Sequence, residues 1–286
     1  MNTVTTSHTA YKSLSAAQVQ AFHERGYHFP VEVLSPAEAK ALRARLEAFE
    51  AHNGGPLAGY LRTKSHLLFP WLDELIRHPR ILDAIEDVLG PNLLVWSTSF
   101  FTKEARDPSY VSWHHDSTYW GLSHPDVVTA WIGFTDSVVA NGCMRVIAGS
   151  HKLEQLPHKD TFAKNNLLTR GQEVQVDVDP RQAVDIEMRA GQASLHHVRI
   201  VHGSEANSSA DRRIGFAIRY IPTYVRQTEG PRDTAMLVRG EDSYHYFDHE
   251  PRPQSDMHPD AVAFHRRACE ESLQILYRGT DKAPVA

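Results

Sequence analysis

Three side chains of the sequence have the types and the spacing to hold a metal ion. His114 and Asp116 are separated by one residue within the aromatic run 113–120, and His202 follows far along the chain. On an extended strand, side chains two residues apart point to the same face, so one strand could present His114 and Asp116 together. Two histidines and one carboxylate that occupy one side of Fe(II) and leave the other side open are typical of non-haem iron oxygenases. The spacing therefore predicts such an iron centre.

The His-x-Asp spacing alone is weak evidence, because 18 histidines in 286 residues make chance occurrences common. Besides His114/Asp116, it occurs at His124/Asp126, His158/Asp160 and His258/Asp260. Proline separates the two residues of the first and the last of these pairs, which favours a turn or a strand end, and the middle pair lies in a polar, charged run. Only the pair at 114 and 116 lies in an aromatic, strand-forming setting that could form a shielded pocket.

The composition excludes several classes of protein. A formal charge of −5, from 30 basic and 35 acidic residues, leaves no basic excess with which to bind nucleic acid. Two cysteines, Cys143 and Cys269, are too few for a disulfide framework and favour a reducing compartment. The first residues form no apolar signal core, and no apolar run is long enough to span a bilayer. We expect a soluble, cytoplasmic protein that acts on a small molecule, without nucleic acid or membrane partners.

Helical patterns dominate residues 1–92. Ser15 and Ser35 can each cap an amphipathic helix at its N-terminus. A third helical segment covers 70–89 and is interrupted near His78, which precedes a proline. We expect these helices to pack on the part of the chain that follows.

After residue 92 the pattern changes to short β-prone runs separated by Gly, Pro, Asn and Asp. Many short strands with such punctuation predict a mainly β fold with flanking α-helices, of the double-sheet jelly-roll type. We expect a single domain over 1–286, with a β core at 93–225, a possible lid at 155–178 and a C-terminal extension at 226–286. The expected strands are 93–102, 111–116, 127–135, 144–147, 183–188, 193–197 and 214–221, and a helix is expected near 261–278.

Several ordered motifs resemble those of a known family. The residues that carry the resemblance are Phe101-Thr102-Lys103, the run 113–120, Trp131, Asn141-Gly142-Cys143-Met144-Arg145-Val146, Gly149-Ser150-His151, His202-Gly203-Ser204, Arg212-Arg213 and Arg219-Tyr220. Together they resemble the phytanoyl-CoA dioxygenase family of Fe(II)/2-oxoglutarate-dependent oxygenases, over roughly residues 15–227. The resemblance implies a double-stranded β-helix, the cupin-like form of jelly roll, which agrees with the strand pattern.

By this resemblance, His114, Asp116 and His202 match the iron ligands and form the catalytic centre. The implied reaction couples oxidative decarboxylation of 2-oxoglutarate, to succinate and CO2, with transfer of oxygen from O2 to a C–H bond of a small metabolite. Halogenating enzymes similar to this family have a small residue in place of the carboxylate. Asp116 is present here, so we expect hydroxylation.

The resemblance also assigns residues to the cosubstrate. Arg213 matches the arginine that binds 2-oxoglutarate, whose far carboxylate needs a planar, bidentate donor that stays charged. Ser204, two residues beyond His202, can donate a second hydrogen bond to this carboxylate. Lys103 and Trp131 match positions that line the cosubstrate pocket in similar proteins.

Four residues are candidates for contact with the substrate: Trp120, Tyr119, His197 and Arg145. The aromatic side chains could form walls of the pocket. His197 and its neighbour His196 lie on one expected strand, so one of the two should face inward. Arg145 and Lys103 could hold an acidic group, which favours an anionic small molecule as substrate.

Two other functions remain open at this point. A zinc-dependent hydrolase could use the same His/Asp/His set with metal-bound water as nucleophile, although Arg213 and Ser204 would then lack a role. A non-catalytic jelly-roll protein could bind metal incidentally through its many histidines. Binding of 2-oxoglutarate to the metal-loaded protein would favour an oxygenase over a hydrolase. Unchanged metal content after replacement of His114 or Asp116 by alanine would favour the non-catalytic binding protein.

Overall fold

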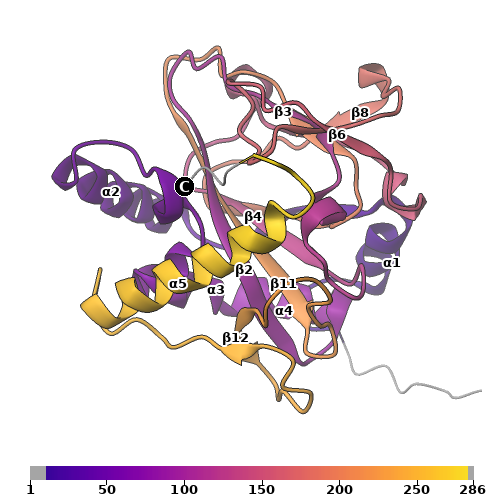
Figure 1. Ribbon diagram of the computed structural model, residues 1–286. Helices are drawn as coiled ribbons and strands as arrows, with labels where there is room; N and C mark the ends of the chain where they lie inside the picture. Colours follow the sequence, from indigo (N-terminus) through magenta and orange to yellow (C-terminus); the bar gives the residue numbers. More distant parts are fainter. Residues whose placement is uncertain (1–10, 283–286) are drawn as a thin grey trace, which may run out of the picture.

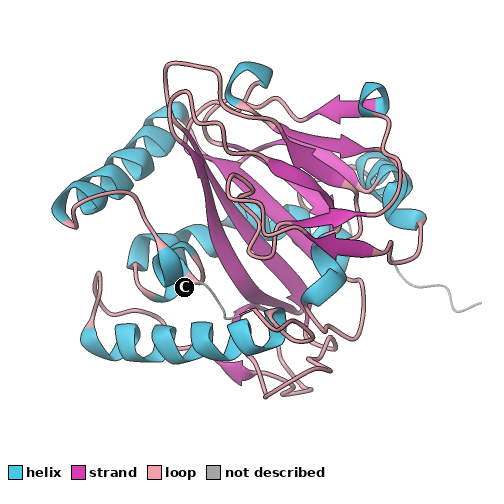
Figure 2. Ribbon diagram, turned by 45° about the horizontal axis from the view of Figure 1, so that its top comes forward, coloured by secondary structure: helices cyan, strands magenta, loops and turns pink. Residues whose placement is uncertain are grey.

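Two largely antiparallel sheets form the centre of the structure, a computed structural model that describes residues 11–282, and helices lie around their outside (Figures 1 and 2). The major sheet has the order β1 (Tyr27–Glu32), β9 (Gln192–His197), β4 (Val128–Gly133), β11 (Arg213–Pro222), β2 (Leu93–Lys103), β12 (Thr234–Arg239) and β13 (Asp248–His249). The minor sheet has the order β3 (Val111–His114), β10 (His202–Ser204), β5 (Met144–Ile147) and β8 (Ala183–Asp185). A separate pair is formed by β6 (His158–Asp160) and β7 (Gln172–Val174).

Local sequence signals determine where the helices begin and end. Ser15 and Ser35 each form a capping box, in which the serine side chain accepts from a backbone N–H and a side chain three residues later accepts from the serine N–H. The expected break near His78 is confirmed, because Pro79 begins a new helix. The helices are α1 (Ala16–Arg25), α2 (Pro36–His52), α3 (Pro70–Ile76), α4 (Pro79–Leu89) and α5 (Pro259–Leu276). Within residues 11–282, no helix is long and apolar enough to cross a membrane.

Strand β11 is buried on both faces and lies between β4 and β2. Its large apolar side chains at alternate positions, Ile214, Phe216, Ile218 and Tyr220, pack in the same core as residues of α1 to α4. Side chains alternate along a strand, so the intervening positions 213, 215, 217 and 219 point to the other face, between the two sheets. This strand therefore separates the helical core from an interior space.

The expected fold class is confirmed: the protein is mainly β, with two sheets in a jelly-roll arrangement and flanking helices. The major sheet reaches beyond the expected β core at both ends, because β1 pairs with β9 and β12 pairs with β2. Pro30 obscures β1 in the sequence, yet proline is tolerated there because β1 is an edge strand. The segment 155–178 contains β6 and β7, and its role as a lid stays a prediction.

A buried ion pair ties the C-terminal part of the chain to the major sheet. Lys64 is 1% exposed and donates to the carboxylate of Glu250 and to the carbonyls of Trp96 and Thr234. The Nε2 atom of His66 lies 2.9 Å from the other carboxylate oxygen of Glu250. Burial alone raises the pKa of the Glu250 carboxyl, but the charge of Lys64 and the hydrogen bond from His66 lower that pKa to about 2. Glu250 is therefore ionised and holds the segment before α5 against β2 and β12.

We expect Glu250→Gln to lower the free energy of unfolding by about 3 kcal/mol, because Lys64 would remain buried without a carboxylate to neutralise it. The pair also predicts a pH dependence. The folded-state pKa of Glu250 lies below its ordinary value of 4.5, so the stabilisation is complete above that pH and is lost as the pH falls towards 2. Urea unfolding of wild type and variant at neutral and acidic pH measures both effects.

Glu270→Gln serves as the control for this prediction. Glu270 is exposed and pairs with Arg266 one turn away on α5, so its replacement should change the free energy of unfolding by no more than about 0.5 kcal/mol. An equally small effect of Glu250→Gln would contradict the stabilising role of the buried pair.

Candidate active site

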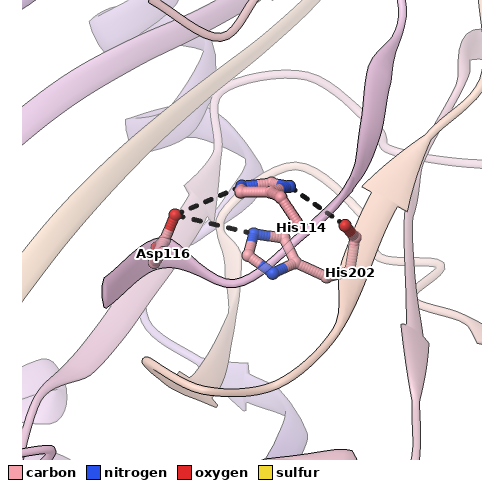
Figure 3. A group of neighbouring side chains, drawn as sticks. All are labelled: His114, Asp116 and His202. Atoms are coloured by element: carbon pink, nitrogen blue, oxygen red, sulfur yellow. Dashed lines mark hydrogen bonds and ion pairs between the residues drawn. The ribbon is translucent and has the colours of Figure 1, made fainter. Parts of the chain in front are cut away.

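The structure brings His114, Asp116 and His202 together between the two sheets (Figure 3). In the antiparallel pairing of β3 with β10, His202 lies opposite His114, and the ring centroids are 4.1 Å apart. The Oδ1 atom of Asp116 lies 3.3 Å from Nε2 of His114 and 3.9 Å from Nε2 of His202. One ligand atom from each residue lies within 4.8 Å of the other two, so the three could bind one ion.

Asp116 reaches the site by a different route from the one that the sequence suggests. The prediction places His114 and Asp116 on one strand, but β3 ends at His114, and Asp116 begins the short 3-10 helix η3 (Asp116–Tyr119). The Asp116 N–H donates to the carbonyl of Val198 at 3.1 Å, which fixes the turn. The carboxylate therefore faces the histidines because the chain turns after β3, and not because of strand alternation.

Hydrogen bonds at the Nδ1 atoms determine which ring nitrogen faces Asp116. The His114 Nδ1 atom lies 2.9 Å from the carbonyl oxygen of Ser112, and the His202 Nδ1 atom lies 3.0 Å from that of Ile200. A carbonyl oxygen only accepts, so Nδ1 is protonated in both rings and Nε2 is the nitrogen left for a metal ion. In the neutral form of each ring Nε2 presents a lone pair, and two such lone pairs and a carboxylate repel one another unless a cation lies between them. The donor set fits Fe(II).

The electrostatics of the site favour the protonation states that bind metal. Burial, and then the nearby His114, lower the pKa of His202 well below its ordinary value, so the ring is neutral. Burial alone raises the pKa of Asp116, but nearby positive charge, which includes that of Arg219, holds that pKa below its ordinary value. Neutral imidazoles and an ionised carboxylate are the forms that ligate a metal.

Arg213 lines the same cavity from the major sheet. Its Nη1 atom donates to the carbonyl of Gly142, and its guanidinium lies 5.4 Å from the centroid of the Trp131 ring. Its Nε atom is buried and has no hydrogen-bond partner among the residues that the structure describes. A Cβ atom at Gly215 would lie 1.8 Å from the Trp131 indole, so only glycine at this position avoids a clash with that ring. The arrangement offers an unused, charged donor to an anion.

Ser204 and Lys103 lie next to Arg213 but not in equivalent positions. Ser204 lines the cavity, and its Oγ atom accepts from the Lys103 Nζ atom at 2.7 Å. Lys103 also donates to the carbonyl of Glu205, so it lies behind Ser204. The resemblance predicts that Lys103 lines the cosubstrate pocket, but Lys103 is not among the residues that line this cavity. Burial, and then the charge of Arg213, lower the pKa of Lys103 to about 7. Arg213 is therefore the more permanent charge at this end of the cavity.

The aromatic candidates for substrate contact lie in a second cavity that adjoins the first. Trp120 and Tyr119 line this second cavity together with Asp116, which also lines the first. The walls of the second cavity include Leu276 of α5, a residue that no local sequence signal connects to the metal ligands. The long-range packing of α5 places that residue there.

The structure differs from the sequence prediction at His197 and Arg145. His196 lines the first cavity, with its ring centroid 5.1 Å from that of His202, and burial lowers its pKa to about 4. His197 points to the opposite face of β9, because neighbouring side chains on a strand alternate. Arg145 donates to Asp185 at 2.9 Å and lines neither cavity.

Arg219 lines both cavities, although sequence reasoning assigns it no role. A signal for it was present, because Arg219 lies on the expected strand 214–221, six residues after Arg213, and side chains an even number of residues apart on a strand face the same way.

Comparison with known proteins agrees with the geometry of the site. A sequence model of the phytanoyl-CoA dioxygenase family matches residues 22–215. The chain is 29% identical over 175 residues to a probable alpha-ketoglutarate-dependent hypophosphite dioxygenase of Stutzerimonas stutzeri, and this match spans 60% of each protein. It is 25% identical over 224 residues to the ectoine dioxygenase of Halomonas elongata, across 70% of this chain and 68% of that relative.

A solved structure resembles the chain over nearly its whole length. The non-heme monooxygenase ThoJ, in its apo form, matches with a TM-score of 0.82 and 37% sequence identity, across 91% of this chain and 98% of the other. The family match covers more than half of the chain and contains the three candidate metal ligands and Arg213. The chain therefore belongs to the phytanoyl-CoA dioxygenase family of Fe(II)- and 2-oxoglutarate-dependent oxygenases.

Proposed function

We propose that the protein is an Fe(II)- and 2-oxoglutarate-dependent hydroxylase of a small metabolite. The observation that carries the proposal is a single cavity that contains His114, Asp116 and His202 together with an unused donor of Arg213. The three ligands alone would also suit a hydrolase. A buried arginine with a free donor beside them suits the acidic cosubstrate of an oxygenase.

In this proposal, His114, Asp116 and His202 bind Fe(II), and Arg213 binds the far carboxylate of 2-oxoglutarate, with Ser204 beside it. Iron and cosubstrate, when bound, supply the oxidising chemistry that transfers an oxygen atom to a C–H bond. The chain itself orients the reactants and excludes water. Asp116 keeps a carboxylate on the metal, which favours hydroxylation over halogenation.

Apolar side chains on the same faces of the sheets support the exclusion of water. Trp131 and Ala217 of the major sheet and Met144 of the minor sheet are buried and line the cavity that the ligands and Arg213 also line. A charged cosubstrate in such surroundings gains more from each hydrogen bond than it would in water. Arg213 therefore accounts for a large part of the expected affinity.

We expect His114→Ala, Asp116→Ala and His202→Ala each to lower the Fe(II) content of the purified protein at least about tenfold, because each removes one of three ligands. Wild-type protein with Fe(II) and 2-oxoglutarate under anaerobic conditions should show a weak visible absorbance, which these variants should lose. Metal analysis and absorbance spectroscopy measure the two effects.

His124→Ala is the matched control, because His124 has the same spacing to Asp126 but lies exposed on the surface. It should leave metal content and absorbance unchanged. Metal binding without any 2-oxoglutarate absorbance in the wild-type protein would favour a zinc hydrolase. Unchanged metal content in His114→Ala would favour incidental metal binding.

We expect Arg213→Gln to weaken 2-oxoglutarate binding roughly 30-fold to 100-fold without loss of metal, because a charge-assisted bidentate contact is lost. Arg212→Gln is the matched control, since the neighbouring Arg212 points away and pairs with Glu50 at 2.6 Å. Anaerobic titration of the visible absorbance gives the affinity of each variant. Equal weakening by both substitutions would contradict the assignment of Arg213.

A further inference from the structure

A second buried arginine lies on the same face of β11 as Arg213. Positions 213, 215, 217 and 219 face the space between the sheets, and the two middle ones are the small residues Gly215 and Ala217. Six residues of extended strand separate the Cα atoms of Arg213 and Arg219 by about 20 Å. The strand therefore carries two guanidinium groups well apart along one face, and both line the cavity that Asp116 also lines.

Arg219 uses only part of its hydrogen-bonding capacity. The side chain is 7% exposed, and its Nη1 atom donates to the Ser99 Oγ atom at 3.0 Å. Its Nε atom is buried without a partner, and its Nη2 atom makes no hydrogen bond to any residue in 11–282. Among the described residues, no carboxylate forms an ion pair with Arg219; burial lowers its pKa, and the charge of Asp116, beyond ion-pair distance, offsets part of that effect. The guanidinium lies 5.1 Å from the ring centroid of Trp120, which covers one of its faces.

The unused atoms form one edge of the guanidinium. Nε–H and Nη2–H point in parallel, which is the geometry that a planar carboxylate accepts with both oxygens. The Asp116 carboxylate is the charge that acts on Arg219, and in the proposed function this carboxylate binds the metal. A buried guanidinium whose donors are unpaired is unfavourable, so an anion that enters the cavity with a substrate would gain charge-assisted hydrogen bonds there.

Apart from the candidate metal ligand Asp116, the other charged groups of the second cavity already have hydrogen-bond partners. Arg170 binds the carboxylate of Asp160 and the carbonyl of Leu276. The carboxylate of Asp233 accepts from the indole nitrogen of Trp96 at 2.6 Å. Arg219 is therefore the group in this cavity whose charge remains available to a ligand.

We propose that Arg219 binds a carboxylate of the substrate through its Nε and Nη2 atoms, so that β11 holds the acidic group of the cosubstrate at one end and that of the substrate at the other. This assignment rests on the proposed function. It replaces Lys103 and Arg145 as the cations that recognise an anionic substrate. The second cavity is lined by Phe101, Trp120 and Leu276, which suit an apolar body attached to the carboxylate.

The test compares small aromatic acids with their uncharged amides. Phenylacetate, 3-phenylpropionate and indole-3-acetate, and the corresponding primary amides, are titrated calorimetrically into anaerobic protein loaded with Fe(II) and saturated with 2-oxoglutarate. Saturation occupies Arg213, so a preference for acids reports on another cation. We expect at least one acid to bind the wild-type protein roughly tenfold to a hundredfold more tightly than its amide.

Arg219→Gln should abolish this preference while metal content and 2-oxoglutarate affinity stay as in wild type. Arg219→Lys, which keeps a positive charge but lacks the planar edge of the guanidinium, should retain part of the preference for acids over amides. Arg189→Gln is the matched control, because it removes an arginine charge from an exposed pair with Glu32; this variant should keep the full preference for acids over amides. Thermal unfolding verifies that each variant is folded, and the wild-type comparison stands without any variant.

Equal binding of every acid and its amide to the wild-type protein would overturn the proposal, as would a preference that survives in Arg219→Gln. Parallel loss of metal or 2-oxoglutarate binding in Arg219→Gln would also overturn it, because Arg219 would then act by positioning Asp116. Failure of the proposed function is a separate result: wild-type protein would show no absorbance with Fe(II) and 2-oxoglutarate. The acid and amide comparison is then made with Arg213→Gln, in which a preference that a further Arg219→Gln substitution removes still identifies Arg219.

Discussion

The register of β3 against β10 is the constraint on which the site depends. It places His114 directly opposite His202, so that two imidazoles meet across a pair of strands too short to be stable alone. A slip of one residue would turn one imidazole to the opposite face of the minor sheet and separate the pair. The neighbouring pairing of β10 with β5 holds this register, because His202 also lies opposite Val146, which is fully buried.

Strand β11 connects this site to the rest of the protein. One face contributes to the apolar core under α1 to α4, and the other face carries Arg213 and Arg219. Two buried cations on one strand are costly, and the large core on the opposite face offsets that cost. Gly215 and Ala217 keep the stretch between the arginines free of bulky side chains, which leaves the interior open beside the metal ligands. Folding energy and binding capacity thus come from opposite sides of the same strand.

Much of this arrangement could be predicted from local signals. Capping serines and Pro79 locate the helices, and alternating β-prone runs locate β2, β4 and β11. The turn that presents Asp116 could not be predicted, because a contact with Val198 determines it. Strand β10 has three residues and no pattern of its own, so only its pairing with β3 and β5 defines it. Which of His196 and His197 faces inward likewise depends on the position of β9 in the sheet.

The position of α5 has a consequence for how such a protein can diversify. The segment that matches the family ends at residue 215, whereas Leu276 and its neighbours on α5 form a wall of the second cavity. The ion pair of Lys64 and Glu250 anchors the segment before α5 to the major sheet. Both residues are far in sequence from every candidate metal ligand. Substitutions along this helix can therefore reshape the space available to a substrate while the reactive centre stays intact. Part of the wall of the second cavity is thus encoded in a stretch of the chain that contains none of the candidate metal ligands, and this part can vary independently of them.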